Sequence, residues 1–571
     1  MLAKPPDHYR TDPEPDRVRT LLFATIPFDY YADRAEYFAG LGVEGAMLAG
    51  IMSNWSDDVW ALGDGTWIVG GSNPRFQTCK RMNARCREVG ITQNSVKVAF
   101  YKLLPDWFDD GGWRTLCENF RQCAIFARDA GFAGVAIDIE YIAQMYVLDY
   151  EAYQAPDYPR GRLRAQARRR GRELMEAMIG EFPEMVNWHL PEGIYHYGPL
   201  AADLFVGMVD ALAERDAPGG IHVCTEATYT RTDPVWVVRF CHWLDGALAD
   251  ACDGKAREYW RRRGTICPGL WPLGYYRDIL GPDGKRIGYS GRRETFGDRV
   301  VGSYADKSEN YPPEDFRRQY AAARMVARHS LWVYCHGSVL WQLTEEEKAR
   351  YGGSASDVLP VAKNLDEYLA VMRGKPIFDS PAFAKVTAAV REGREIDMLA
   401  GTGTPRQWWH IGPFPNPEGK GLDTVYPPEQ TIDLDASYES LSGPLRWQLH
   451  ALRGDGFVNL RHLVARKDYV LAYSVTWVES PSPQKAFIRF GSDDSGKIWV
   501  NGKLVHSIDV VRGATEDEDI VPVELPAGRI PILVKCGNYR GTWGFYLRIT
   551  DSAGDEISNL HWAGSETSSR R

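Results

Sequence analysis

Two acidic side chains at the end of a short apolar stretch are the first sign of chemistry in this sequence. The stretch reads Gly131-Phe-Ala-Gly-Val-Ala-Ile-Asp-Ile-Glu140, and its acids are Asp138 and Glu140. Alternate side chains of a strand share a face, so both acids point away from the branched apolar residues between them. In a parallel βα barrel, that end of the strand holds the active site. The alternative is a buried ion pair with a barrel Lys or Arg.

A third acid follows the same pattern in another stretch. His222, Cys224 and Glu226 share one face of a predicted strand. Cleavage of a glycosidic bond usually needs two carboxyl groups, one that protonates the leaving oxygen and one that attacks the anomeric carbon or activates water. Asp138 and Glu140 lie about 7 Å apart along a single strand, so a facing partner should come from elsewhere. We predict Glu140 and Glu226 as the working pair, with Asp138 as a third catalytic candidate. For Glu226 the alternatives are a structural salt bridge and a sugar-hydroxyl acceptor.

Six residues within or just after predicted strands are candidates for contacting a substrate. They are Lys102, Tyr141, His189, Trp271, His336 and Trp341. Flat aromatic rings suit the apolar faces of sugars, histidines suit sugar hydroxyls, and Lys102 could keep a carboxylate ionised. Ordinary packing is the alternative for the aromatic and histidine side chains, and a solvated surface position is the alternative for the lysine. Glu192 is the reserve acid if Glu226 takes no part.

Strand and helix patterns alternate over the part of the chain that carries these residues. The predicted strands are Thr20–Ile26, Gly45–Met52, Val96–Leu103, Gly134–Glu140, Met185–Leu190, Gly220–Thr228, Thr265–Leu270 and Leu331–Leu340. The predicted helices include Arg162–Ile179, Ala201–Arg215, one from about Pro234 to Arg262, Pro313–Arg328 and Leu365–Arg373. The alternation predicts an α/β fold, and eight such units fit a (β/α)8 TIM barrel. A doubly wound sheet is the alternative, although no glycine-rich phosphate loop follows the first strand.

From about residue 376, short alternating strands replace the helical pattern. They are Trp408–Pro413, Val470–Val478, Lys485–Gly491, Gly496–Val500, Lys503–His506, Ile520–Leu525, Ile530–Val534 and Trp543–Ile549. Asn501-Gly502 between two of them is a strong hairpin signal. The regular spacing predicts an all-β sandwich. We therefore expect an N-terminal arm at 1–18, the barrel at 19–375, a linker at 376–404 and the sandwich at 405–571.

The barrel acids resemble two known patterns. Asp138-Ile-Glu140 resembles the end of the Asp-x-Asp-x-Glu motif on the fourth strand of chitinases, although Ala136 stands where that motif keeps its first Asp. This resemblance implies that Glu140 donates the proton and Asp138 orients it. An acid on the fourth strand combined with one on the sixth is also similar to retaining α-galactosidase-like barrels. That pattern implies that Glu140 or Asp138 attacks and Glu226 donates.

The sandwich half resembles the jelly-roll, galactose-binding-like modules of bacterial carbohydrate enzymes. The matching segments are Trp409-His-Ile-Gly-Pro-Phe-Pro415, Gly491-Ser-Asp-Asp-Ser-Gly-Lys-Ile-Trp-Val-Asn-Gly-Lys503 and Trp543-Gly-Phe-Tyr-Leu-Arg-Ile549. The central segment is also similar to the Asp-Asp segment of lectin-like protective-antigen modules. The resemblance implies a carbohydrate-binding accessory domain. Asp493 and Asp494 are candidates for a structural Ca²⁺ site, with turn capping as the alternative.

Composition narrows the range of partners. The net charge of −9 argues against nucleic-acid binding, and no run of about 18 apolar residues predicts a membrane helix. No His-Glu-x-x-His motif or cysteine spacing predicts a catalytic metal, so we expect no cofactor. The first residues lack an apolar signal segment, so we expect a cytoplasmic protein, or an exported one if a signal has been removed.

These patterns together predict a glycoside hydrolase that acts on an oligo- or polysaccharide. Two alternatives stay open. One is a non-catalytic carbohydrate-binding protein, because a fold does not determine a function. The other is a polysaccharide lyase on the same barrel, with a Tyr or His base and an Arg or Lys that neutralises a uronate.

Overall fold

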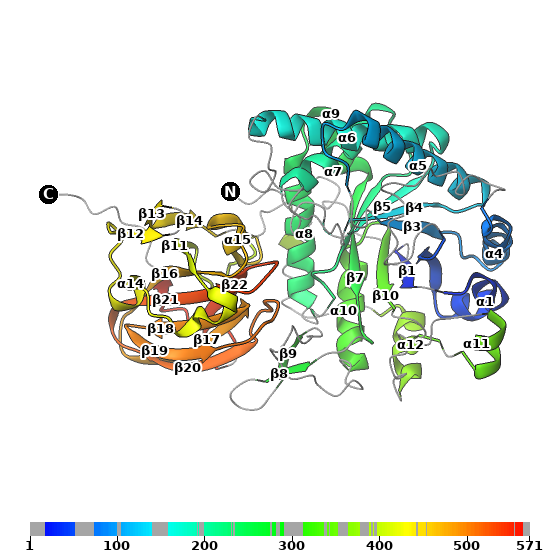
Figure 1. The fold of residues 1–571 in the computed structure, drawn as a ribbon. Helices are drawn as coiled ribbons and strands as arrows, with labels where there is room; N and C mark the ends of the chain where they lie inside the picture. The colour runs from blue at the N-terminus through cyan, green and yellow to red at the C-terminus, as the bar shows by residue number, and fades with distance from the viewer. Residues whose placement is uncertain are drawn as a thin grey trace. The chain divides into compact units, whose positions relative to one another are not determined.

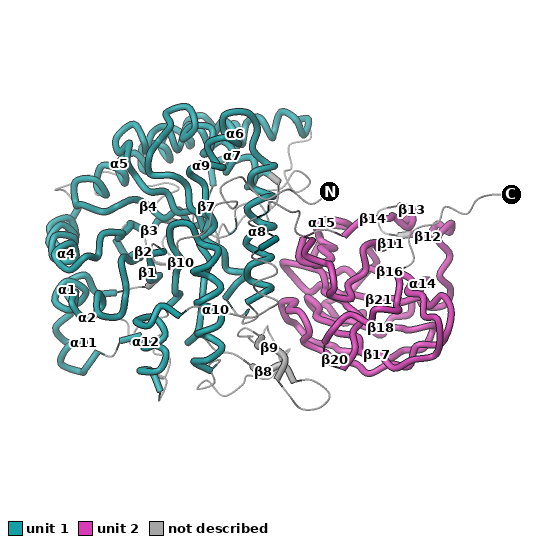
Figure 2. Tube along the Cα trace, turned by 180° about the vertical axis from the view of Figure 1, so that it is seen from behind, with its two compact units in different colours: residues 1–274, 310–396 teal, residues 275–309, 397–571 magenta. Residues whose placement is uncertain are grey.

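The chain folds into two compact units, coloured separately in Figure 2. One unit comprises residues Met1–Gly274 and Asn310–Ile396, and the other comprises Tyr275–Glu309 and Asp397–Arg571. The structure, a computed structural model, describes residues 18–24, 26–51, 73–99, 104–139, 158–190, 192, 199–229, 231, 234–273, 277–280, 286–290, 312–335, 340–341, 343–351, 364–376, 388–389, 392, 397–440, 443–452, 454–552 and 554–562. Within these residues, no helix is both long and apolar enough to span a membrane.

The first unit contains a closed barrel of eight parallel strands, which confirms the predicted fold (Figure 1). The strands are β1 (Arg19–Ala24), β2 (Val43–Leu48), β3 (Ser95–Ala99), β4 (Gly134–Asp138), β5 (Val186–Leu190), β6 (Ile221–Thr225), β7 (Gly264–Leu270) and β10 (Ser330–Tyr334). Each strand pairs with the next barrel strand along the chain, and β10 closes the ring by pairing with β1. The doubly wound open sheet is therefore excluded. A separate hairpin, β8 (Arg277–Leu280) and β9 (Arg286–Ser290), interrupts the series.

Helices follow the barrel strands and surround them (Figure 1). They are α1 (Phe28–Asp33), α2 (Ala35–Gly40), α4 (Phe76–Glu88), α5 (Asp110–Asp129), α6 (Arg160–Glu181), α7 (Pro199–Glu214), α8 (Pro234–Ala251), α9 (Gly254–Arg263), α10 (Pro313–Val326), α11 (Glu345–Tyr351) and α12 (Leu365–Gly374). The prediction of one helix from about Pro234 to Arg262 is wrong. The first helix ends at Ala251, and Gly254 opens the second with a φ of 44°, a left-handed conformation that favours glycine.

The barrel interior is filled by a cluster of buried apolar side chains from most of the strands. Its members are Leu21, Phe23, Met47, Ala136, Trp188, Leu190, Cys224, Cys267 and Trp332. We call this set the interior cluster. Because alternate side chains of a strand share a face, Ala136 places Asp138 on the inner face of β4, and Cys224 places His222 there on β6. The same rule places His189, between Trp188 and Leu190, on the outer face of β5.

The second unit is built from antiparallel sheets. Besides β8 and β9, its strands are β11 (Gln407–Pro415), β12 (Ser437–Ser440), β13 (Gly443–Arg446), β14 (Gln448–Ala451), β15 (Val458–Asn459), β16 (Val470–Ser480), β17 (Gln484–Asp493), β18 (Ser495–Val500), β19 (Lys503–Ile508), β20 (Asp519–Leu525), β21 (Gly528–Asn538), β22 (Gly544–Thr550) and β23 (His561–Trp562). One sheet has the order β14-β11-β16-β21-β18-β19, with β23 added to β16, and another has the order β15-β22-β17-β20. Short helices α14 (Pro427–Gln430) and α15 (Leu460–Leu463) and the 3₁₀ turns η7 (Pro417–Gly419) and η8 (Gly421–Asp423) connect them.

All eight predicted strands of this unit are present. The Asn501-Gly502 hairpin is confirmed, because Val500 pairs with Lys503 and both turn residues have positive φ, 49° and 77°. The strands that sequence reasoning missed, β12 to β15 and β23, are two to four residues long. Such short segments, with Gly, Pro, Ser and Glu among their residues, carry little alternation and few strand-favouring side chains.

The ten cysteines are free, and Cys117 is the one that is not fully buried. Burial raises the pKa of the Cys117 thiol to about 12 and that of the Cys86 thiol to about 11. The thiolate is the reactive form of cysteine, so these side chains behave as small apolar residues at neutral pH. Cys224, Cys267 and Cys335 are among the buried cysteines.

Buried histidines should make the stability of the protein depend on pH. Burial lowers the pKa of His222, His242 and His410 to about 3. Histidine in the unfolded chain titrates near pH 6.5, so between about pH 6.5 and 3 the unfolded chain binds more protons than the native one. The stability contributed by these neutral rings is therefore complete above about pH 6.5. We expect it to fall with decreasing pH by at most about 1.4 kcal/mol per pH unit for each ring.

Denaturant titrations across this pH range measure the effect. His410 Nδ1 shares a hydrogen bond with the Ser474 hydroxyl at 2.8 Å. His410→Gln replaces the ring with a neutral polar side chain that does not titrate in this range. This variant should therefore show a shallower loss of unfolding free energy toward low pH than the parent protein. His561 is exposed, and His561→Gln is the matched control, expected to leave the slope unchanged. Equal slopes for the parent and His410→Gln would contradict the prediction.

Candidate active site

Asp138 ends β4 and forms a buried ion pair with Lys97 of β3. The distance between Asp138 Oδ2 and Lys97 Nζ is 2.9 Å, and the two side chains are 3% and 0% exposed. The parallel register aligns Ala99 with Asp138, so Lys97 lies one inward-facing position earlier along the neighbouring strand. Asp138 thus has the buried basic partner that the structural alternative required. The same contact holds a negative charge at the carboxyl-terminal end of the barrel strands, where a barrel enzyme carries its chemistry.

Glu226 follows β6 and belongs to a tight turn. Its Oε1 accepts a hydrogen bond of 3.1 Å from the hydroxyl of Tyr229. The Tyr229 side chain packs against the interior cluster, so its contact with Glu226 places the acid at the mouth of the barrel. Glu192, the reserve acid, is fully buried and accepts hydrogen bonds from this turn. The structure therefore brings Glu192 and Glu226 together.

Aromatic rings from four barrel segments pack together at the carboxyl-terminal ends of the strands. The set consists of Phe23, Tyr229, Trp271, Trp332 and Tyr334, and we call it the aromatic wall. The Tyr229 and Tyr334 rings stack at 5.5 Å with an interplanar angle of 21°, and Trp271 lies edge-on to both, at 5.7 and 5.1 Å. Tyr229, Trp271 and Tyr334 are partly exposed. Such rings can stack on the apolar face of a sugar.

A series of contacts through the aromatic wall links Asp138 to Glu226. The Lys97 ammonium lies 5.9 Å from the centre of the Phe23 ring, and that ring packs against Tyr334 at 5.6 Å. The unbroken sequence of contacts is Asp138, Lys97, Phe23, Tyr334, Tyr229 and Glu226. Negative charge, a positive charge and partly exposed rings therefore meet in one region of the barrel. Such a region suits a polar ligand with apolar faces.

Two of the predicted substrate-binding residues lie away from this region. His189 is 1% exposed and packs edge-on against Phe205 of α7, with ring centres 5.1 Å apart, on the outer side of β5. Trp341 is 1% exposed and packs against Phe38 of α2 at 5.5 Å. Strand alternation alone would have placed His189 outside, because its neighbours Trp188 and Leu190 fill the interior. Trp271, by contrast, is part of the aromatic wall.

The predictions for Glu140, Tyr141, Lys102 and His336 fall outside the described residues and stay predictions. Sequence reasoning missed Lys97. Its signal was a lone basic residue among apolar ones in Val96-Lys-Val98, on the face that Ser95 and Ala99 share. A charged residue in a buried strand needs a partner, so it pointed to an acid on a neighbouring strand.

The Asp493-Asp494 segment is held by hydrogen bonds to neighbouring loops. Asp494 accepts from the backbone N–H groups of Arg512 and Tyr539, at 3.0 and 2.5 Å, and Asp493 accepts from the Thr542 hydroxyl at 2.5 Å. These partners lie 18, 45 and 49 residues away in the sequence, so the two aspartates connect separate loops and do not simply cap their own turn. In the part of the chain that the structure describes, no group of three or more His, Cys, Asp or Glu side chains could hold a metal ion. The Ca²⁺ site stays a prediction.

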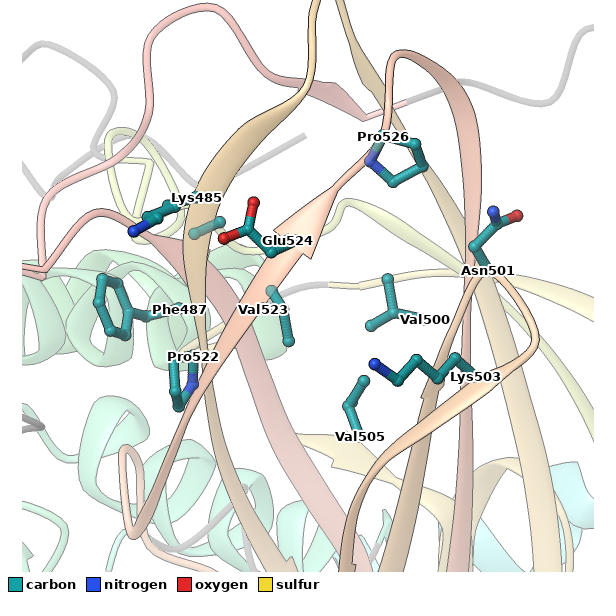
Figure 3. A pocket seen from close by; sticks show the side chains of 11 residues that line it. Lys485, Phe487, Val500, Asn501, Lys503, Val505, Pro522, Val523, Glu524 and Pro526 are labelled. Atoms are coloured by element: carbon teal, nitrogen blue, oxygen red, sulfur yellow. The ribbon is translucent and has the colours of Figure 1, made fainter.

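A pocket of about 490 Å³ opens in the sandwich between β19 and β20 (Figure 3). These two strands lie at the ends of their respective sheets. The apolar part of the lining includes Val500, Val505 and Val523, and the polar part includes Lys503 and Glu524. In Figure 3 the Lys503 side chain extends into the space between the two strands. The volume of the pocket and its mixed apolar and polar lining are typical of small-ligand sites.

Comparisons with known proteins do not assign this chain to a family. No protein-family model matches the sequence, and no curated protein matches it. Solved structures that resemble it include a glucosidase from Croceicoccus marinus, at 8% identity over 93% of this chain and 98% of that chain, with a TM-score of 0.29. Chitinase ChiA74 from Bacillus thuringiensis has 10% identity over 93% of this chain and 100% of its own, with a TM-score of 0.28. Morphinone reductase in complex with tetrahydroNAD has 13% identity over 65% of this chain and 92% of its own, with a TM-score of 0.29. Likenesses this distant carry no argument about function, which therefore has to be argued from the site.

Proposed function

We propose that the barrel is a glycoside hydrolase that cleaves an oligo- or polysaccharide at the carboxyl-terminal ends of its strands. The observation that supports this most is the series of contacts that links the two acids. An acid at the end of β4 and an acid after β6 are connected by a wall of partly exposed aromatic rings. Hydrolysis of a glycosidic bond needs two carboxyl groups and a surface that holds the sugar ring, and this arrangement offers both.

The surroundings of the acids suggest how they divide the work. In the proposal, protonated Glu226 gives its proton to the leaving oxygen as the glycosidic bond breaks. A second carboxylate, that of Asp138 or of Glu140, attacks the anomeric carbon or takes a proton from the attacking water. The Lys97 ammonium favours negative charge at β4, which suits the second task. This division corresponds to the α-galactosidase-like pattern.

Hydrolysis of a panel of aryl glycosides and oligosaccharides by the native protein and by Glu226→Gln tests the proposal. We expect cleavage of at least one substrate class by the native protein and its loss in the variant. Suppose instead that no glycan is cleaved while one still binds. That result would overturn the proposal and favour a non-catalytic carbohydrate-binding protein.

Trp271 offers a separate test of sugar stacking. Its ring lies at the edge of the aromatic wall, in contact with Tyr229 and Tyr334. Trp271→Ala removes this surface, and we expect KM to rise about tenfold with a smaller change in kcat. Trp477 of the sandwich, which packs under Arg529, supplies the control variant Trp477→Ala, expected to leave KM for aryl glycosides unchanged. An unchanged KM in Trp271→Ala would show that the Trp271 ring does not bind the sugar.

The sandwich pocket favours glycan binding as a second function. We propose that the pocket between β19 and β20 holds part of a carbohydrate chain, with Lys503 and Glu524 bonding hydroxyl groups over an apolar floor. Lys503→Ala should then weaken retention of the whole protein in glycan affinity gels. Leu504 is the next residue of β19 and is 46% exposed outside the pocket lining, so Leu504→Ala is the matched control. Equal retention of both variants would rule out this pocket.

A further inference from the structure

We propose that Glu192 is a positioning residue for Glu226, which fixes the turn that presents this acid to the substrate. The inference rests on the proposed function and deepens it, because it explains how the barrel holds its proton donor. Glu192 follows β5 and is 0% exposed. A fully buried carboxylate is costly unless hydrogen bonds compensate it, so its partners indicate its task.

Three donors converge on one oxygen of Glu192. Oε1 accepts from the Thr225 hydroxyl at 2.6 Å, from the Glu226 backbone N–H at 2.7 Å and from the Ala227 backbone N–H at 2.6 Å. The two backbone donors flank the Cα atom of Glu226. Rotation of either peptide group would break one of these bonds, so the carboxylate fixes the direction in which the Glu226 side chain leaves the backbone.

The other end of the same turn is held from two more elements. Gln319 of α10 donates from Nε2 to the carbonyl oxygens of Thr228 and Tyr229, at 2.6 and 3.1 Å. The Thr228 hydroxyl donates to the Gly269 carbonyl of β7 at 2.7 Å and accepts from the Gly269 N–H at 3.0 Å. Tyr229, thus anchored, donates its hydroxyl to Glu226. Contacts from three elements therefore fix both the backbone and the carboxyl group of the acid.

The charge of the buried Glu192 carboxylate suggests that this side chain positions Glu226 and does not merely fill space. Hydrogen bonds from backbone N–H groups to a carboxylate are shorter and stronger than those to a neutral acceptor, and all three bonds here are short. Reaction rates are sensitive to placement, since an error of about 1 Å can cost about a hundredfold in rate. Losing Glu192 should therefore slow turnover more than it weakens substrate binding.

Kinetics on a pair of aryl glycosides, one with a good and one with a poor leaving group, tests the inference. Glu192→Ala should lower kcat about a hundredfold on the poor leaving group, with little change in KM. The loss should be smaller on the good leaving group, which needs less protonation. Glu192→Gln keeps an oxygen acceptor in place and should recover part of kcat, because a neutral acceptor forms weaker hydrogen bonds than a carboxylate.

Asn187 supplies a matched control on the same strand. It is 1% exposed at the other end of β5, and its Nδ2 donates to the carbonyl oxygens of Met185 and Gly220, at 3.0 and 2.9 Å. Asn187→Ala should lower stability but leave kcat of the folded protein and its leaving-group dependence unchanged. If Glu192→Ala behaves in the same way, Glu192 is a structural residue and the inference is overturned.

Two further outcomes can be told apart: a Glu192→Ala variant that does not fold, and a Glu226 that is not the proton donor. If Glu192→Ala does not fold, Thr225→Val removes one donor of the same network, and we expect a severalfold lower kcat with the same leaving-group pattern. An unchanged kcat in that variant would also overturn the inference. If Glu226→Gln itself retains full activity, the proposed role of Glu226 fails, whatever Glu192 does.

Discussion

Replacing Glu226 with glutamine is expected to lower kcat/KM by about 10³-fold on a substrate with a poor leaving group. The amide can still accept the hydrogen bond from Tyr229, so the turn and the fold should persist. It has no acidic proton for the leaving oxygen, and the barrier of the bond-breaking step therefore rises. A good leaving group should show a much smaller loss, because it departs without protonation.

Steady-state kinetics of purified variants measure this effect. Glu258, an exposed residue of α9, provides the control Glu258→Gln, which should match the native protein. Asp138→Asn and Glu140→Gln, compared in the same assay, show which of these two acids is the partner of Glu226. An unchanged kcat/KM in Glu226→Gln on every substrate would show that this acid is structural.

Removal of the Lys97 ammonium is expected to cause the largest loss of stability. Lys97→Met leaves the buried Asp138 carboxylate without its ion-pair partner, at a cost of about 3–5 kcal/mol in unfolding free energy. The double variant Lys97→Met/Asp138→Leu removes both charges and should recover most of that loss, because an apolar pair pays no desolvation cost. Urea denaturation of the native protein, both single variants and the double variant gives the coupling energy directly.

An exposed ion pair supplies the control for this cycle. Arg81 and Asp29 are 62% and 51% exposed, and Arg81→Met should change the unfolding free energy by less than about 1 kcal/mol. A similarly small change in Lys97→Met would mean that the buried pair does not form in solution. A double variant no more stable than Lys97→Met would mean that the charge itself is not what destabilises the single variant.

The barrel was predictable because its strands are buried and its helices are long. Val135 and Ile137 alternate with Ala136 and Asp138 in β4. That local pattern predicts both the strand and the residues that share its inward face. The same reasoning placed Glu226 at a strand end. The helix break before Gly254 was missed, since apolar periodicity continues on both sides of it.

The contacts of the site could not be read from the chain. The pairing of Lys97 with Asp138 depends on the register of β3 against β4, which no local pattern states. The task of Glu192 depends on the path of a turn that begins at the end of another strand. For His189 the local pattern was informative. Its neighbour Trp188 faces the barrel interior, so strand alternation places His189 outside, although a histidine side chain is chemically suited to a site. Strand alternation was the better guide there.

Glycan cleavage in water enriched in heavy oxygen tests the central claim most directly. Hydrolysis transfers one oxygen atom from water to the sugar for every glycosidic bond broken, and mass spectrometry of the products detects it. We predict one labelled oxygen per new reducing end with the native protein, and about 10³-fold slower formation of that product with Glu226→Gln on a substrate with a poor leaving group. Unlabelled products that carry a new double bond would show elimination and contradict hydrolysis. The same protein would then be a lyase.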